Sequence, residues 1–138
     1  MKKLSPLLLL PICLYAKDWT EAHVYNFKNV CLNHMPNAAL VSLKSVRLEN
    51  PIDTSDKIDI FYEAVVLESI KGEFKESKRM RFFRVSEEIP DISKLEKTIG
   101  KKCYIFTEEV ADIVYVDTGN FWLHKDYLEE VVVLKYKR

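Results

Sequence analysis

Hydrophobic and polar residues alternate with a period of about two along much of this 138-residue chain, so we expect a protein built mainly of β-strands. The clearest strand signal is IDIFYEAVVLESI at residues 58–70, which is rich in β-branched and aromatic side chains. Lys71 and Gly72 supply a turn, and residues 74–85 return as the second strand of a long hairpin. Further strands are expected at residues 38–48, 102–107, 113–116 and 121–124.

One helix is expected before the first strand. Residues 18–32 begin with Asp18, which can cap free amides, followed by Glu21 at the spacing of a capping box, and their apolar residues fit one broad buried face. Residues 33–37 contain a proline and end this helix, and the polar residues 50–57 form a loop.

A second, short helix is expected within residues 86–100. Pro90 and Asp91 open it, and Gly100 closes it. The last segment, residues 126–136, satisfies the helical and the strand period in part, so the pattern leaves both open.

These elements predict a mainly β fold, α+β at the margin: a small OB-like, partly open barrel with an N-terminal helix and one short inserted helix. A β-sandwich is the alternative. A chain of this length buries one core, so we expect a single globular domain over residues 17–138.

Residues 1–16 have the order of a cleavable secretory signal: two lysines, an apolar run at residues 4–15, and the small residue Ala16 at the cleavage site. The apolar run is shorter than the roughly 20 residues that cross a bilayer. We therefore expect an exported protein, periplasmic or secreted, with no stable membrane insertion after cleavage. The alternative is lipidation of Cys13, although Ile12 stands where that processing needs a small residue.

The charges limit the class of partner. The chain carries 21 basic and 21 acidic residues, and cleavage of the signal removes two lysines and no acidic residue. The mature domain is then slightly acidic and has no long-range field that would attract nucleic acid or an anionic membrane. We therefore expect no nucleic-acid partner.

Cys31 and Cys103 remain in the mature domain, and an oxidising compartment favours a disulfide between them. Closing so long a loop is worth on the order of 4 kcal/mol in the chain-entropy model. The alternative is a metal site, because Cys31 and His34 stand three apart with His23 upstream. Zinc sites of this kind need a second closely spaced pair, which is missing, so we expect no metal and no cofactor.

The order of elements over residues 58–123 resembles small exported bacterial relatives of the netrin-like and tissue-inhibitor-of-metalloprotease OB domains. A strand closing on Lys71-Gly72 and the later segment GKKCYIF at residues 100–106 carry this resemblance. The resemblance implies an OB fold. The inhibitors act through a cysteine at the mature N-terminus, where this chain would expose Lys17, so metalloprotease inhibition is not implied.

The motifs for catalysis are weak. Asp117-Thr118-Gly119 matches the catalytic turn of aspartic proteases, but that site needs two carboxylates and the chain has one copy. The same residues, with Asn120, form an ordinary hairpin turn. No serine stands in a Gly-x-Ser-x-Gly elbow, and the three glycines are too far apart to form a phosphate-binding loop.

Cationic residues at positions 75–84 alternate with Met80 and two phenylalanines, a pattern that suits a single-strand nucleic-acid binder. Glu73 and Glu76 dilute it, and a charged edge strand explains the same residues. Such an edge can accept a partner chain, for which an acidic surface is expected. The candidate partner-binding residues are Lys78, Arg79, Arg81, Phe82, Arg84 and Trp122.

The sequence therefore predicts a non-enzymatic exported domain that binds another protein in the envelope or outside the cell. One alternative is a periplasmic inhibitor or immunity protein that blocks an envelope enzyme or toxin. A second alternative is an enzyme whose site has no recognisable motif.

Overall fold

The computed structural model describes residues 21–49 and 57–136, and the chain divides into two compact units after His34. The predicted signal, with Cys13, lies outside the described residues. The predicted loop at residues 50–57 also lies outside them, apart from Lys57.

The first unit confirms the N-terminal helix over its described residues. Residues 21–25 are α-helical and continue into the π-helix η2 (Asn26–Leu32). The N–H of Asn33 donates to the carbonyl of Lys28 at 3.1 Å, the five-residue spacing of a π-turn, so the end of the helix is wider than predicted. Its buried side chains are Phe27, Cys31 and Leu32.

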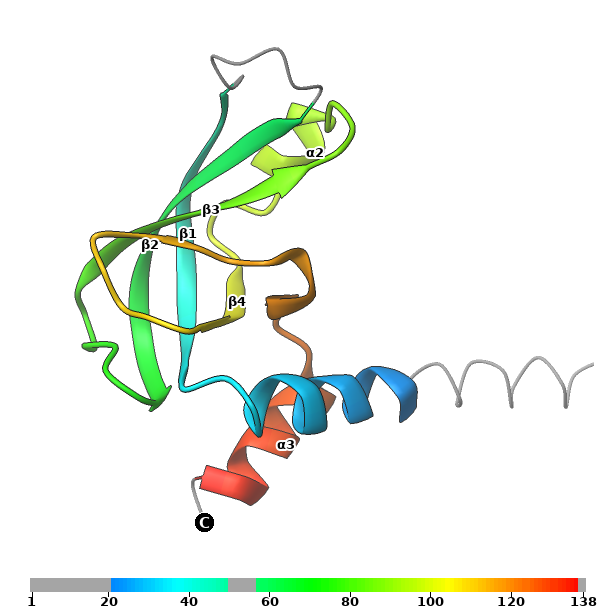
Figure 1. Cartoon of the computed structure of the whole chain (residues 1–138), viewed down its shortest axis with the longest axis vertical. Coiled ribbons are helices and arrows are strands. Elements are labelled where there is room, and N and C mark those ends of the chain that lie inside the picture. The colour runs from blue at the N-terminus through cyan, green and yellow to red at the C-terminus, as the bar shows by residue number, and fades with distance from the viewer. Residues whose placement is uncertain (1–20, 50–56, 137–138) are drawn as a thin grey trace, which may run out of the picture. The chain divides into compact units, whose positions relative to one another are not determined.

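The described residues of the second unit form one six-stranded sheet with the order β5-β3-β2-β1-β4-β6 (Figure 1). Neighbouring strands are antiparallel except for β3 and β5, which are parallel. The sheet is not closed, which confirms the mainly β, OB-like, partly open barrel and excludes the two-sheet sandwich. The strands are β1 (Asn37–Glu49), β2 (Ile58–Lys71), β3 (Arg79–Ser86), β4 (Lys102–Thr107), β5 (Ile113–Tyr115) and β6 (Phe121–Leu123).

The short link between β5 and β6 requires the sheet to curve. These strands are the two edges of the sheet, and in a flat sheet they would lie about 24 Å apart. The chain from Tyr115 to Phe121, which includes the 3-10 helix η3 (Thr118–Asn120), reaches only about 16 Å. The ring centroids of Phe121 on β6 and Tyr62 on β2 are 5.4 Å apart although β4 and β1 lie between these strands in the sheet, as an inward-curved sheet requires.

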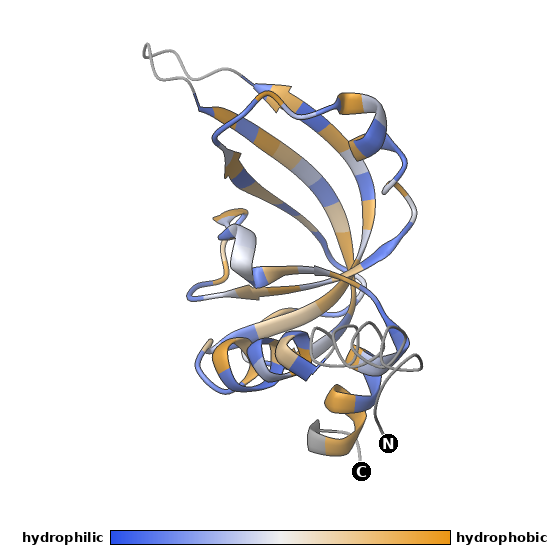
Figure 2. Ribbon diagram, turned by 90° about the vertical axis from the view of Figure 1, so that its right-hand side faces the viewer, coloured by the Kyte–Doolittle hydropathy of each residue, from blue (hydrophilic) through white to orange (hydrophobic). Residues whose placement is uncertain are grey.

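The core lies on the concave face of this sheet. The inward residues of β2 and β3 alternate with polar or half-exposed outward ones, and Figure 2 shows the alternation along the long strands. Bulges in β1, such as the one at Lys44, bend that central strand. The core side chains are Ala39, Val41, Leu43, Ile60, Tyr62, Ala64, Val66, Phe74, Met80, Phe82, Cys103, Ile105, Val114 and Val116.

Two helices of the second unit follow from local sequence. Asp91 caps α2 (Ile92–Glu96) by accepting from the hydroxyl of Ser93 at 2.7 Å and from the N–H of Ser93 at 3.0 Å, and these two hydrogen bonds lower the pKa of Asp91. The ambiguous last segment is the helix α3 (Asp126–Tyr136), in which Leu128 and Val132, four residues apart, are both buried.

The predicted return strand at residues 74–85 begins too early. β3 starts at Arg79, and residues 74–78 form a turn in which Ser77 has a φ of +66°. Phe74 is buried within this turn. Because it is an apolar residue in step with the apolar residues of β3, the sequence pattern includes it in the strand. The predicted hairpin at Asp117–Asn120 is also wrong, because β5 and β6 do not pair and η3 joins opposite edges of the sheet.

Candidate functional site

A row of four side chains crosses the outer face of the sheet. The register places Arg47 of β1 beside Phe61 of β2, Phe61 beside Phe83 of β3, and Phe83 beside Tyr115 of β5. The ring centroids of Phe61 and Phe83 are 5.3 Å apart, those of Phe83 and Tyr115 5.4 Å, and Arg47 Cζ lies 4.5 Å from the Phe61 centroid. We call these residues the aromatic row.

The aromatic row arises because β2 and β3 each carry two consecutive aromatic residues. Successive side chains of a strand point to opposite faces, so Tyr62 and Phe82 enter the core, where their centroids are 4.8 Å apart. Phe61 and Phe83 then face outward and are half-buried. Tyr115 at the edge is 52% exposed, so the row has an accessible end.

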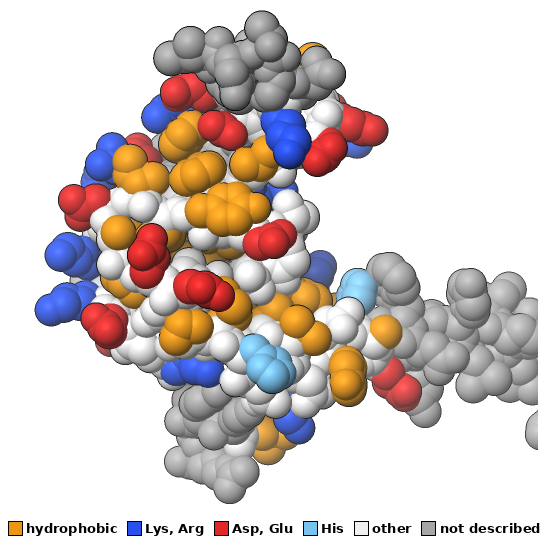
Figure 3. All heavy atoms as spheres, viewed as in Figure 1, with side chains coloured by type: hydrophobic (Ala, Val, Ile, Leu, Met, Phe, Trp, Pro, Cys, Tyr) orange, Lys and Arg blue, Asp and Glu red, His pale blue; other side chains and the backbone are white. Residues whose placement is uncertain are grey.

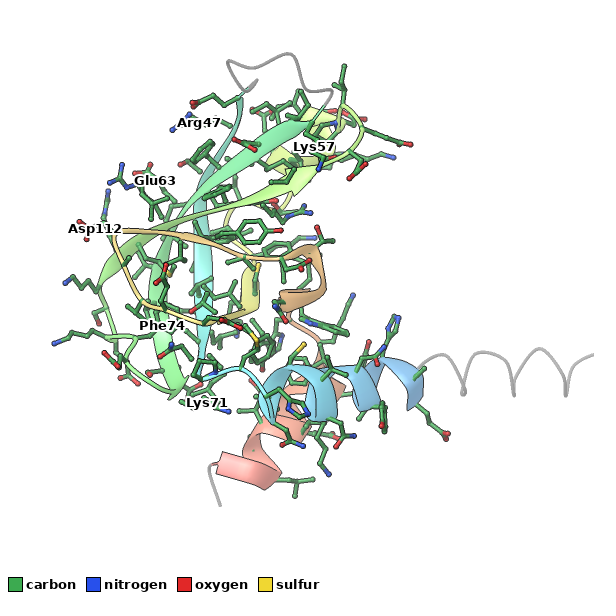
Figure 4. The ribbon with its side chains drawn as sticks, viewed as in Figure 1. Arg47, Lys57, Glu63, Lys71, Phe74 and Asp112 are labelled. Carbon is green, nitrogen blue, oxygen red and sulfur yellow. The ribbon has the colours of Figure 1, made fainter. Side chains whose placement is uncertain are left out.

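A cationic margin adjoins the aromatic row along the same strands. The bulge in β1 leaves Lys44 outside the register, and its side chain lines a cavity of about 280 Å³ together with Arg79 and Arg81. Glu63 and Asp112 lie on the same rim, and Figure 4 labels both. Figure 3 shows hydrophobic side chains gathered over the strands with charged side chains around them.

A second cavity, of about 200 Å³, shares Arg79 and Asp112 with the first. It is also lined by Lys75, Lys78 and the buried Phe74. Within the described ranges, Lys44, Lys75, Lys78, Arg79 and Arg81 form no ion pair. We call these five residues the basic cluster.

The structure brings three of the sequence-predicted partner residues together, since Lys78, Arg79 and Arg81 belong to the basic cluster. Phe82 is fully buried in the core and presents no surface to a partner. Trp122 stands on β6, at the other edge of the sheet from β5, where its Nε1 donates to the carbonyl of Gly119 at 2.9 Å.

Arg84 shares the inward face of β3 with Phe82 rather than the outer face with Arg81. Its guanidinium donates to the hydroxyl of Tyr62 at 3.0 and 3.2 Å and lies 4.8 Å from the Phe121 ring centroid. Burial raises the pKa of Tyr62, and the positive charge of Arg84 opposes that rise.

The expected charged edge strand is not an edge. β3 lies between β2 and β5, and the register pairs Arg81 with Ile113. Arg81 therefore does not serve to protect an unpaired strand.

The two cysteines of the predicted disulfide lie in different units, and each is buried. Burial raises the pKa of the Cys103 thiol to about 12. The disulfide stays a prediction.

Asp117 of the Asp-Thr-Gly motif and His124 both have structural partners. Asp117 accepts from the N–H of Gly119 at 3.4 Å as the cap of η3, and His124 pairs with Glu129 at 3.2 Å. Among the described residues, no group of three or more histidine, cysteine or acidic side chains is arranged to hold a metal ion.

Sequence reasoning missed all four residues of the aromatic row. The doubled aromatics at residues 61–62 and 82–83 were the signal that could have found Phe61 and Phe83, because a doubled aromatic in a strand places one ring on each face.

A scan against family models and a search of curated proteins found no match for this chain. The resemblance to netrin-like domains therefore stays a prediction. None of the helices in the described ranges has the length and apolar character needed to cross a bilayer.

Proposed function

We propose that this chain is a non-enzymatic, exported protein-binding domain whose contact surface is centred on the aromatic row. The observation that carries the proposal is the continuous line of Phe61, Phe83 and Tyr115 across three strands of the outer face. Aromatic residues and arginine are enriched at the centres of protein interfaces, and a polar rim usually surrounds them. The aromatic row, with Arg47 at one end and the basic cluster beside it, has this composition.

The packing within the aromatic row favours binding by a rigid surface. The ring of Phe61 stacks on that of Phe83, and the ring of Tyr115 packs against Phe83 at a tilt of 52°. Arg47, which also pairs with Glu49, covers Phe61. Side chains already held in place lose little conformational freedom when a partner docks. The predicted export signal supports a partner in the envelope or outside the cell, and an enzyme or toxin held inactive there is the concrete variant of the proposal.

The test is site-specific photocrosslinking in the native host. A photoreactive residue at Tyr115 is expected to give a discrete crosslinked species with another protein. The same residue at Ile89, which is 80% exposed in the loop between β3 and α2, serves as the matched control. In a second variant the photoreactive residue is moved to Ile113, next to the row, and Tyr115→Ala is combined with Phe83→Ala. This double substitution should abolish the crosslinked product. Crosslinks that are absent at Tyr115, or equal at Ile89, would contradict the proposal.

A further inference from the structure

We infer that the partner inserts an extended, acidic segment of its chain into the two cavities of the basic cluster, an inference that rests on the proposed function. Five cations gather there: Lys44, Lys75, Lys78, Arg79 and Arg81. Exposed cations on a protein surface repel one another unless carboxylates or bound anions compensate them.

The compensation within this chain is incomplete. Glu63 and Asp112 stand on the rim, and Glu73 lines the second cavity, so three carboxylates line the cavities with five cations. Glu76, between Lys75 and Lys78 in the sequence, is outside both linings and accepts from the N–H of Ser69 at 3.4 Å. None of the three lining carboxylates forms an ion pair within the described ranges, and Glu63 instead accepts a hydrogen bond from the Ser45 hydroxyl at 2.9 Å. The cavities therefore keep an excess of positive charge on a chain whose formal net charge is zero.

The arrangement of the charges favours a peptide over a polyphosphate or nucleic acid. Asp112 lines both cavities and stands among the cations, where it would repel a ligand with a charge on every unit. A peptide can place its carboxylates beside Arg81 and Lys78 and a neutral residue beside Asp112. Successive side chains of an extended peptide alternate in direction, which suits such spacing.

The two cavities also offer apolar contact. The second cavity is lined by Phe74, Met80 and Val110, and the first adjoins the face that carries Phe83 and Tyr115. A segment that combines carboxylates with one or two apolar side chains would use both properties. A purely anionic polymer would use only the charges.

The direct test uses a defined probe, a fluorescein-labelled 12-residue peptide with Glu at alternate positions and a central Phe. Its control has Gln in place of every Glu. By fluorescence anisotropy at low ionic strength, the Glu peptide should bind at least about tenfold more tightly than the Gln peptide, and the difference should shrink as salt is added.

Charge reversal locates the site. Arg79→Glu combined with Arg81→Glu should weaken Glu-peptide binding at least about tenfold. Lys94→Glu combined with Lys97→Glu makes the same change of charge on exposed positions of α2 and at its C-terminal cap, and it should leave binding within about twofold. Circular dichroism verifies that both variants are folded. Equal binding of the Gln peptide, or equal losses in the two charge variants, would overturn the inference.

A competition arm separates the ligand classes. Heparin and a single-stranded oligonucleotide, added at matched charge, should displace the Glu peptide less effectively than unlabelled Glu peptide does. More effective displacement by either polymer would overturn the assignment of a peptide. In the host, a Tyr115 crosslink that survives Arg79→Glu with Arg81→Glu would refute this inference and leave the proposed function standing. Absence of any Tyr115 crosslink would refute the proposed function itself.

Discussion

Replacing Gly72 by alanine tests how the turn after β2 is held. Gly72 has a φ of +86°, which side-chain-bearing residues avoid. A Cβ at this position would lie 2.1 Å from Asn37 Oδ1 and 2.6 Å from the carbonyl oxygen of Pro36. Both separations are far below van der Waals contact, so the alanine variant has to displace Asn37.

The displacement matters because Asn37 joins three segments while only 6% exposed. Its Oδ1 accepts from the N–H of Glu73 at 2.8 Å, and its Nδ2 donates to the carbonyls of Glu108 at 3.2 Å and Thr107 at 3.5 Å. The positive φ costs about 1–2 kcal/mol, and each buried group left without its partner costs about 1–3 kcal/mol. With one such group, Gly72→Ala should lose about 2–5 kcal/mol of unfolding free energy, or about 8–20 °C in Tm.

Chemical denaturation followed by far-UV circular dichroism measures this loss, and two glycines provide controls. Gly100 has a φ of +88°, and a Cβ added there would meet nothing within 4 Å, so Gly100→Ala should show the backbone strain alone, about 1–2 kcal/mol. Gly119→Ala, with open space and no positive φ, should change stability by less than about 0.5 kcal/mol. If Gly72→Ala reduces the free energy of unfolding no more than Gly100→Ala does, the close approach of Gly72 to Asn37 does not stabilise the turn.

Three further predictions concern Tyr62 and the two cysteines. Tyr62→Phe removes the acceptor of both Arg84 hydrogen bonds and should reduce the free energy of unfolding by about 1.5–3 kcal/mol; an equally stable variant would refute this. In reduced protein, the raised pKa of Cys103 predicts full stability below about pH 8.5 and a decline towards pH 12, because the unfolded thiol ionises first. Cys103→Ala should flatten this decline when the free energy of unfolding is measured against pH. An unchanged slope in the variant would refute the assignment of the decline to Cys103. For the disulfide, thiol labelling of denatured, unreduced protein should find neither Cys31 nor Cys103 reactive, and two reactive thiols would refute it.

The strands were predictable because their periodicity is strong. In β2 the inward residues Ile60, Tyr62 and Ala64 alternate with outward ones without interruption, and the predicted and observed bounds differ by one residue. The errors occur where burial does not follow a strand. Phe74 is buried although it lies in a turn, and Asp117 caps a 3-10 helix that joins opposite edges of the sheet. The alternation of polar and apolar residues predicts neither of these roles.

The candidate site was predictable only in part. Lys78, Arg79 and Arg81 are neighbours in the sequence, so their clustering could be anticipated. Arg47 and Tyr115 meet the same row from strands far apart in the chain, and that meeting depends on the register of three strand pairs. A shift of one residue in the register of any pair would place these side chains on the other face of the sheet. A single sequence does not determine that register.

The central position of β1 has a consequence for the order in which the chain folds. β2 pairs with β1, and β3 with β2, after short connections, whereas β4 reaches β1 through pairs such as Asn37 and Thr107, which are 70 residues apart. Contacts of such sequence separation form slowly, because loop-closure entropy is lost before they stabilise the chain. The β1–β2–β3 meander can therefore present Arg47, Phe61 and Phe83 early, while Tyr115 joins them only when β5 docks on β3. A partner that requires the whole row would discriminate a finished domain from a folding intermediate.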